Sequence, residues 1–206
     1  MRKFFTLFSV IILTFVLSAC SNNSENEKIL SKEGVAPYEL SESDTYLLES
    51  LGLSMDANII SFKAPKTAKS LEVNVYVLND DNTWNVTSGG LISLGQDADP
   101  DERLEGTFTM LLKDNYAIDF NINTKARASF NAPAMDVDFE NMASLRGFLT
   151  DFQKIEINKE IPVALMIYDS GTSMRSHEVE DFFTPSIFED LDLIQAVTLT
   201  FTDGFD

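Results

Sequence analysis

The chain has 206 residues, of which 33 are acidic and 15 are basic, so its formal net charge at pH 7 is −18. This length suits one substantial hydrophobic core. The acidic excess argues against a nucleic-acid-binding protein, because phosphate recognition needs clustered lysine and arginine. Hydrophobic residues make up 44% of the chain, which argues against a largely disordered protein.

The N-terminal segment has the features of an export signal. Arg2 and Lys3 precede an apolar run over 4–17, whose length suits a signal peptide better than a membrane span of about 20 residues. Leu17-Ser18-Ala19-Cys20 follows and resembles the lipobox of bacterial lipoproteins at each position. The resemblance implies that the Cys20 sulfur receives a diacylglyceryl group and that residues 1–19 are removed. The alternative is that Cys20 is incidental and ends an uncleaved anchor.

Lipidation would place the protein on the extracytoplasmic face of the cell membrane, since two acyl chains give stable attachment. The leader carries Arg2 and Lys3, so without it 13 of the 15 basic residues remain and the net charge becomes −20. Cys20 is the only cysteine, which excludes a disulfide within the chain. The chain also resembles the small lipoproteins of Gram-positive bacteria, a likeness that assigns no activity.

The mature chain is predicted to form a lipidated tether over 20–36 and a single β-rich extracytoplasmic domain over 37–206. The tether residues are small and polar and show no periodicity. The domain is predicted to open with a short helix over 41–51. Ser41 and Asp44 form an approximate cap for this helix. Tyr46, Leu47 and Leu51 would share one of its faces.

Strands are predicted where apolar and polar residues alternate, or where short apolar runs end in turn residues. The clearest alternation places Leu71, Val73, Val75 and Val77 on one face of a strand. The predicted strands are 59–63, 71–78, 83–87, 91–94, 104–113, 116–123, 161–168 and 193–202. Turns are predicted over 79–82, at Gly89-Gly90 and at Asp114-Asn115.

One segment differs from this pattern. Apolar residues recur every three or four positions over 139–155, which favours a helix, with a strand that ends at 155–157 as the alternative. Residues 185–191 are a further helix candidate. Many short strands with turns between them predict a mainly β domain, an antiparallel β-sandwich or jelly-roll-like fold with one to three short helices.

Asp169 is the candidate catalytic residue. It follows the apolar run 161–168 and begins the sequence Asp-Ser-Gly-Thr-Ser, which resembles the active-site turn of aspartic proteases. In that family two such carboxylates share a proton and activate water, so the chemistry needs a second copy of the turn, for example in a homodimer. The family's later hydrophobic-hydrophobic-glycine segment has no counterpart in 193–202, which lacks glycine. The alternative is an ordinary hairpin turn.

The only histidine, His177, has no nucleophile elbow of the Gly-x-Ser-x-Gly type to act with. One histidine and one lipidated cysteine also give no usual zinc ligand set. Its polar neighbours predict a solvated histidine on a surface strand.

The strongest metal-like spacing combines Asp97, Asp99, Asp101 and Glu102. Alternate carboxylates can converge on Ca²⁺, which prefers oxygen ligands. The spacing is not that of an EF-hand, because Glu102 occupies the glycine position of that loop. The alternative is a solvated acidic loop.

Trp84 is the candidate ligand-binding residue. Together with Tyr76, Phe108 and Tyr116 it could provide aromatic platforms for a carbohydrate, and the alternative is core packing. No lysine or arginine follows Arg175, so the C-terminal region could present an acidic face to a cationic partner or serve solubility alone.

These observations predict a membrane-anchored cell-surface lipoprotein with a non-catalytic module that binds a glycan, a peptide or another envelope protein. The alternatives are an envelope hydrolase of the aspartic type that uses Asp169 and a calcium-stabilised structural module.

Overall fold

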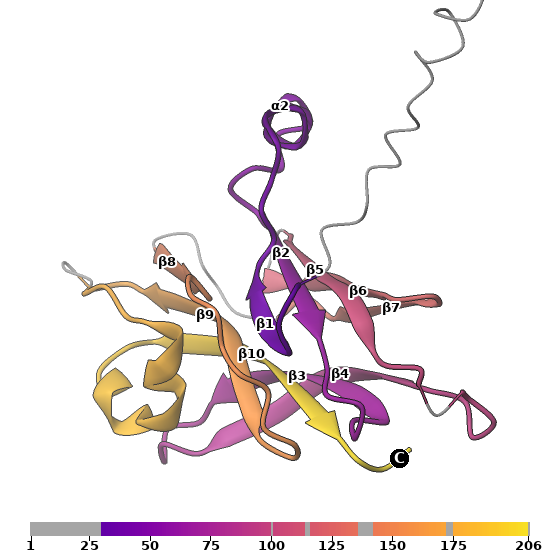
Figure 1. Ribbon diagram of the computed structural model, residues 1–206. Helices are drawn as coiled ribbons and strands as arrows, with labels where there is room; N and C mark the ends of the chain where they lie inside the picture. The colour runs from indigo at the N-terminus through magenta and orange to yellow at the C-terminus, as the bar shows by residue number, and fades with distance from the viewer. Residues whose placement is uncertain (1–29, 100, 114–115, 136–141, 172–174, 206) are drawn as a thin grey trace, which may run out of the picture.

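The computed structural model describes residues 30–99, 101–113, 116–135, 142–171 and 175–205 (Figure 1). These residues form ten strands, one α-helix and two 3-10 helices. In chain order the elements are β1 (Gly34–Pro37), α2 (Glu42–Ser50), β2 (Ala57–Lys63), β3 (Ser70–Leu78), β4 (Trp84–Ser93), β5 (Glu105–Leu112), β6 (Ile118–Asn123), β7 (Arg127–Ala132), β8 (Ala143–Phe148), β9 (Glu160–Asp169), η2 (Val179–Phe183), η3 (Pro185–Phe188) and β10 (Leu193–Thr202).

The strands form two antiparallel five-stranded sheets, which confirms the predicted β-sandwich. The first sheet has the order β1-β2-β5-β6-β7 and the second has the order β4-β3-β10-β9-β8. The two sheets pack through their inner faces, where Phe62 of β2 contacts Phe201 of β10 with 5.7 Å between ring centroids. Both rings are fully buried. All buried hydrophobic side chains of the described residues lie between Val35 and Phe201, so residues 30–206 contain a complete core.

Alternation along the strands explains how one face of each reaches this core. In β3, Leu71, Val73 and Val75 are buried while the residues between them are only partly covered. Strands β5 and β6 follow the same two-residue period, so their threonine and asparagine side chains are directed to the outer face of the first sheet.

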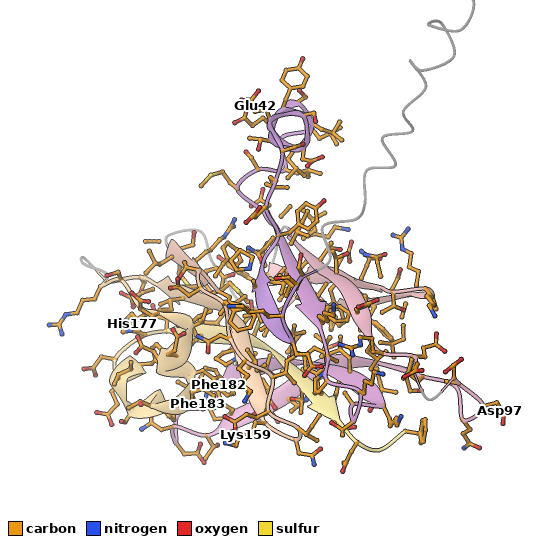
Figure 2. The ribbon with its side chains drawn as sticks, in the orientation of Figure 1. Glu42, Asp97, Lys159, His177, Phe182 and Phe183 are labelled. Atoms are coloured by element: carbon orange, nitrogen blue, oxygen red, sulfur yellow. The ribbon has the colours of Figure 1, made fainter. Side chains whose placement is uncertain are left out.

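In the second sheet the edge strand β4 is largely exposed, but strands β9 and β10 are buried on both faces, which explains their mainly apolar sequences. The outer face of this sheet carries the 3-10 segments, whose Phe182 and Phe188 pack against Trp84 of β4. Figure 2 shows Phe182 and Phe183 in this segment, beside the second sheet.

The domain begins earlier than the sequence predicts. Gly34–Pro37, which falls mostly within the predicted tether 20–36, forms β1 and pairs with β2. Val35 is fully buried and exchanges two backbone hydrogen bonds of 2.8 Å with Gln153. Ordered structure therefore begins before the predicted boundary at 37, because burial of Val35 and pairing with β2 hold a segment that otherwise has tether composition.

The predicted helix over 139–155 is also wrong within its described part, 142–155. Ala143–Phe148 forms strand β8, which pairs antiparallel with β9. The edge of β9 needs a hydrogen-bonding neighbour, and this requirement outweighs the helical spacing of the apolar residues. Residues 139–141 lie outside the described residues.

Four shorter segments can also be compared with the predictions. Gly89 and Gly90 lie inside β4 and form no turn there. Strand β7 has no counterpart among the predicted strands. Residues 185–188 form the short 3-10 helix η3 where a helix was a candidate. Asp114 and Asn115 lie outside the described residues, but β5 and β6 on either side of them pair as an antiparallel hairpin.

Candidate functional site: a groove beneath helix α2

The connection between β1 and β2 projects from the sandwich, and we call residues 38–56 the α2 arm (Figure 1). No residue of helix α2 is buried. The arm carries large apolar side chains with exposed fractions between 58% and 78%: Tyr46, Leu47, Leu51 and Met55. The helix predicted over 41–51 is confirmed, but its predicted apolar face does not pack into the core.

Local interactions account for the limits of this helix. Ser41 and Asp44 form a capping box, in which the Asp44 N–H donates to Ser41 Oγ at 3.2 Å and the Ser41 N–H donates to Asp44 Oδ2 at 2.8 Å. Gly52 has a φ of 69° and ends the helix in the left-handed conformation. Such a cap contributes about 1 kcal/mol, while a nine-residue helix is only marginally stable in water. Contact with a partner would therefore stabilise α2 further.

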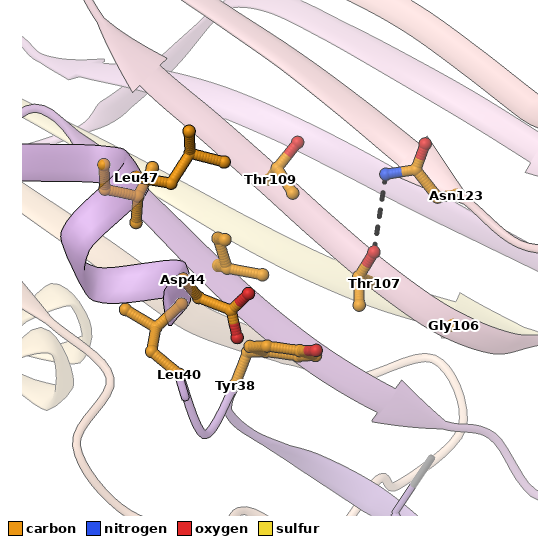
Figure 3. Close-up of a pocket in the computed structure, with 10 residues that line it drawn as sticks. Tyr38, Leu40, Asp44, Leu47, Gly106, Thr107, Thr109 and Asn123 are labelled. Atoms are coloured by element: carbon orange, nitrogen blue, oxygen red, sulfur yellow. Dashed lines mark hydrogen bonds between the residues drawn. The ribbon is translucent and has the colours of Figure 1, made fainter. Parts of the chain in front are cut away.

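A groove of about 340 Å³ lies between the α2 arm and the outer face of the first sheet (Figure 3). Its size falls within the range of small-ligand pockets. One wall is apolar and comes from the arm, with the side chains of Leu40, Leu47 and Leu48. The remaining lining residues are Tyr38, Asp44, Ile59, Gly106, Thr107, Thr109 and Asn123.

The floor of the groove is polar because it is the outward face of alternating strands. Asn123 Nδ2 donates to Thr107 Oγ1 at 3.4 Å (Figure 3), and Asn121 Nδ2 donates to Thr109 Oγ1 at 3.5 Å. Ser129 adds a hydrogen bond of 2.6 Å to Asn121. The two long asparagine–threonine bonds leave hydroxyl and amide groups able to pair with a ligand. The groove therefore combines an apolar wall with a hydrogen-bonding floor.

The charge on the α2 arm is of one sign, whereas the sheet beside the groove also carries Arg127, which donates to Asn121 Oδ1 at 3.1 Å. Between positions 38 and 56 the arm contains no lysine or arginine, and its acidic residues are Glu39, Glu42, Asp44, Glu49 and Asp56. Asp56 is already ion-paired with Arg146 of β8. Asp44 belongs to the groove lining, and its carboxylate oxygen also accepts the capping hydrogen bonds. The groove therefore favours a ligand that carries positive charge.

None of the candidate site residues predicted from the sequence lines this groove. One feature of the sequence does indicate the groove. A capped helix lies within a connection of 19 residues, which is far longer than a usual hairpin loop. The floor residues come from β5 and β6, which become neighbours of the arm only in the folded protein.

The structure places Asp169 at the end of β9 in a turn closed by side-chain hydrogen bonds. Asp169 is only 6% exposed, and its Oδ2 accepts the Gly171 N–H at 3.1 Å. The Ser170 N–H and hydroxyl both donate to Asp192 Oδ2 at 2.6 Å. Thr172 and Ser173 of the protease-like motif lie outside the described residues. The described contacts are those of a turn stabilised by carboxylates.

Asp192 provides a pH-dependent test of this turn. Hydrogen bonds from Ser170, with a further contribution from Asp169, hold the pKa of Asp192 below its usual value. We expect Ser170→Ala to raise the pKa of Asp192, measured by carbon-detected NMR titration, while Ser176→Ala leaves it unchanged.

The sign of the effect on stability follows from this direction. A carboxyl group with a lowered pKa stabilises the fold above its unfolded pKa, and the contribution is lost as the pH falls through the folded pKa. Ser170→Ala should therefore reduce the loss of stability on acidification. An Asp192 pKa that does not respond to this substitution would contradict the hydrogen-bonding account.

The candidate calcium ligands do not converge. Asp101 forms an ion pair with Lys66, which lowers the pKa of Asp101, and Glu102 pairs with Lys125 at 2.8 Å. Asp99 accepts the Asp101 N–H at 2.8 Å, and Asp97 lies at the tip of its loop (Figure 2). The described residues contain no group of three or more histidine, cysteine, aspartate or glutamate side chains that could hold a metal ion. Lys66 and Lys125 therefore balance the negative charge of Asp101 and Glu102, which a bound calcium ion would otherwise balance.

Calcium is accordingly expected to leave thermal stability unchanged. A site saturated at 100 times its dissociation constant would add about 2.7 kcal/mol, which corresponds to a rise in Tm of roughly 5 °C or more. We expect millimolar calcium and a chelator to give the same Tm within about 1 °C, where 1 kcal/mol corresponds to a larger shift. A chelator-dependent fall in Tm would restore the calcium hypothesis.

Trp84 and His177 have structural contacts. Trp84 stacks on Phe182 with 4.9 Å between centroids, and its Nε1–H donates to the Phe182 carbonyl at 2.9 Å. His177 lies beside the 3-10 segment, where Nδ1 is 3.1 Å from Asp181 Oδ2 and the ring is 5.0 Å from Phe188 (Figure 2). The prediction of a solvated histidine on a surface strand is therefore wrong. The packing alternative describes Trp84.

No family model, curated protein or solved structure matches this chain. Among the described residues, no helix is long and apolar enough to cross a membrane.

Proposed function

We propose that this protein is an extracytoplasmic lipoprotein, anchored to the cell membrane through Cys20, whose β-sandwich is a non-catalytic binding module. We further propose that the groove beneath α2 is its binding site. The observation that carries this proposal is the α2 arm, in which large apolar side chains are exposed beside a polar sheet face and no helical residue is buried.

Physical arguments support an interaction role for the arm. Burial of apolar surface yields about 25 cal/mol per Å², so an arm that exposes several leucines gains stability when a ligand covers it. Clustered apolar exposure on a soluble domain is characteristic of interaction sites. The Asp169 turn and the acidic loop over 97–102 have their own hydrogen bonds and ion pairs, which favours the binding module over the hydrolase and calcium alternatives.

The anchor is tested through Cys20. We expect Cys20→Ala to abolish incorporation of radiolabelled fatty acid and to leave an unprocessed precursor or a released protein, because diacylglyceryl transfer needs the cysteine sulfur. Ser21→Ala is the matched control and should retain the label. Labelling that survives Cys20→Ala would contradict lipidation at this residue.

The groove is tested by binding of the neutral apolar dye Nile red to a protein that comprises residues 30–206. We expect the dye to bind with enhanced fluorescence and Thr109→Trp, which adds a bulky ring to the floor, to weaken this binding at least about tenfold. Asn85→Trp, at an exposed position of β4 in the other sheet, is the matched control and should bind the dye as the unchanged domain does. Equal dye binding by all three proteins would contradict a ligand site in the groove.

A further inference from the structure

We propose, on the basis of the binding function above, that the groove receives a short amphipathic segment of a partner protein that carries both large apolar and basic side chains. The apolar wall and the acidic arm together select this chemistry. Neither feature alone would distinguish such a segment from a lipid, a glycan or a cation.

The apolar side of the ligand follows from the shape and extent of the exposed surface. Leu40, Leu47 and Leu48 line the groove, and Leu51 and Met55 continue the apolar surface beyond it. Helix α2 has nine residues and a length of about 14 Å, which corresponds to roughly two to three turns of a partner helix. Aliphatic side chains dominate this wall. A glycan site usually stacks its sugars on several aromatic rings, whereas Tyr38 is the single aromatic residue of the groove lining.

The basic side of the ligand follows from charge complementarity. The arm carries five acidic residues and no lysine or arginine, and Asp44 brings one of these charges to the groove lining. Arg146 balances the charge of Asp56, so the excess negative charge comes from the other four. Opposite charges steer association and orient the bound segment, while like charges disfavour it. A second copy of this chain, with its net charge of −18, is therefore a poor partner. An anionic lipid surface is repelled for the same reason.

Binding should also order the arm. A short helix without buried residues lacks the tertiary packing that stabilises most protein helices. A partner that covers Leu47 and Leu51 would supply that packing. Amide hydrogen exchange over 45–51 should therefore slow when the ligand binds, while exchange in β10, at the centre of the second sheet, should remain unchanged.

The experiment uses residues 30–206 and three synthetic peptides of equal length, composed of leucine and lysine, serine and lysine, or leucine and glutamate. Binding is measured by fluorescence anisotropy at low and high salt. We expect only the leucine–lysine peptide to bind strongly, with weaker binding at high salt. We also expect it to protect the amides of α2 from exchange.

Substitutions separate the two components of recognition. We expect Leu47→Ser and the double variant Glu42→Gln/Glu49→Gln each to weaken binding about tenfold, because each removes one component from the arm. Glu180→Gln, in η2 on the other sheet, is the matched control and should bind as the unchanged domain does. Circular dichroism and Tm confirm that every variant is folded.

Several other outcomes would each overturn the inference. Equal binding of the serine–lysine peptide, or no effect of Leu47→Ser, would overturn the inference because recognition would rest on charge alone. Binding to phosphatidylglycerol vesicles that depends on Leu47, without peptide binding, would overturn it in favour of a membrane surface. Nile red binding in the groove without peptide binding would overturn this inference and leave the proposed function standing. Failure of both probes would overturn both proposals.

Discussion

Replacement of Phe201 by alanine is expected to lower the free energy of unfolding by about 4 kcal/mol, because it removes a fully buried ring at the contact between the two sheets. Phe201 of β10 meets Phe62 of β2 at 5.7 Å, so the cavity would open on both sheets at once. In a domain of this size the corresponding fall in Tm is roughly 10 °C. Urea unfolding followed by the fluorescence of Trp84, the only tryptophan, measures the change.

Phe183→Ala is the control for this substitution. Phe183 is 60% exposed, so its truncation should change the free energy of unfolding by less than about 1 kcal/mol. Similar losses for the two variants would mean that the contact between the sheets contributes no more than a surface ring. The sandwich would then be stabilised mainly within each sheet.

The sequence predicts the sandwich because most of its strands bury one face. The alternation of Leu71, Val73 and Val75 fixes both the identity and the orientation of β3, and the same holds for β5 and β6. Strand β10 also lies where the sequence places it, at 193–202. The neighbouring strand β9 is also buried on its outer face, where the 3-10 helix η2 packs, and no local sequence pattern predicts this packing.

The errors arise where a partner element decides the structure. Ala143–Phe148 has helical apolar spacing and becomes a strand because it pairs with β9. Gly34–Pro37 has tether composition and becomes a strand because Val35 reaches the core and pairs with β2. Both are short edge segments, and their conformation depends on hydrogen-bond partners that lie far away in the sequence.

The candidate site shows the same division between local and non-local information. Ser41, Asp44 and Gly52 encode the helix and its ends locally, so the sequence predicts α2 closely. Whether its apolar side chains are buried depends on where the arm projects, and that direction is set by the pairing of β1 with β2. The sequence therefore predicts the helix but not the groove.

Gly106→Ala is expected to lower the free energy of unfolding by about 3 kcal/mol. Gly106 has a φ of 154°, a conformation that is essentially restricted to glycine. A Cβ at this position would lie 1.9 Å from the Asn123 carbonyl oxygen of the neighbouring strand β6. Because this contact is with backbone, β5 and β6 must move apart to relieve it. Thermal and urea unfolding measure the loss.

Gly95→Ala is the matched control, since a Cβ at Gly95 has no atom within 4 Å and its φ needs no glycine. That variant should be as stable as the unchanged protein or slightly more stable, because alanine restricts the unfolded chain. Equal stability of the two variants would show that the backbone at Gly106 adapts freely.

The same substitution connects the fold to the site. Gly106 and Asn123 both line the groove, so a shift of β5 against β6 would alter the floor that Thr107 and Asn123 form. Gly106→Ala should therefore weaken Nile red binding even at temperatures where the variant remains folded, whereas Gly95→Ala should not. A variant that is destabilised but binds the dye normally would indicate that the arm alone forms the site, because only the sheet side of the groove is disturbed.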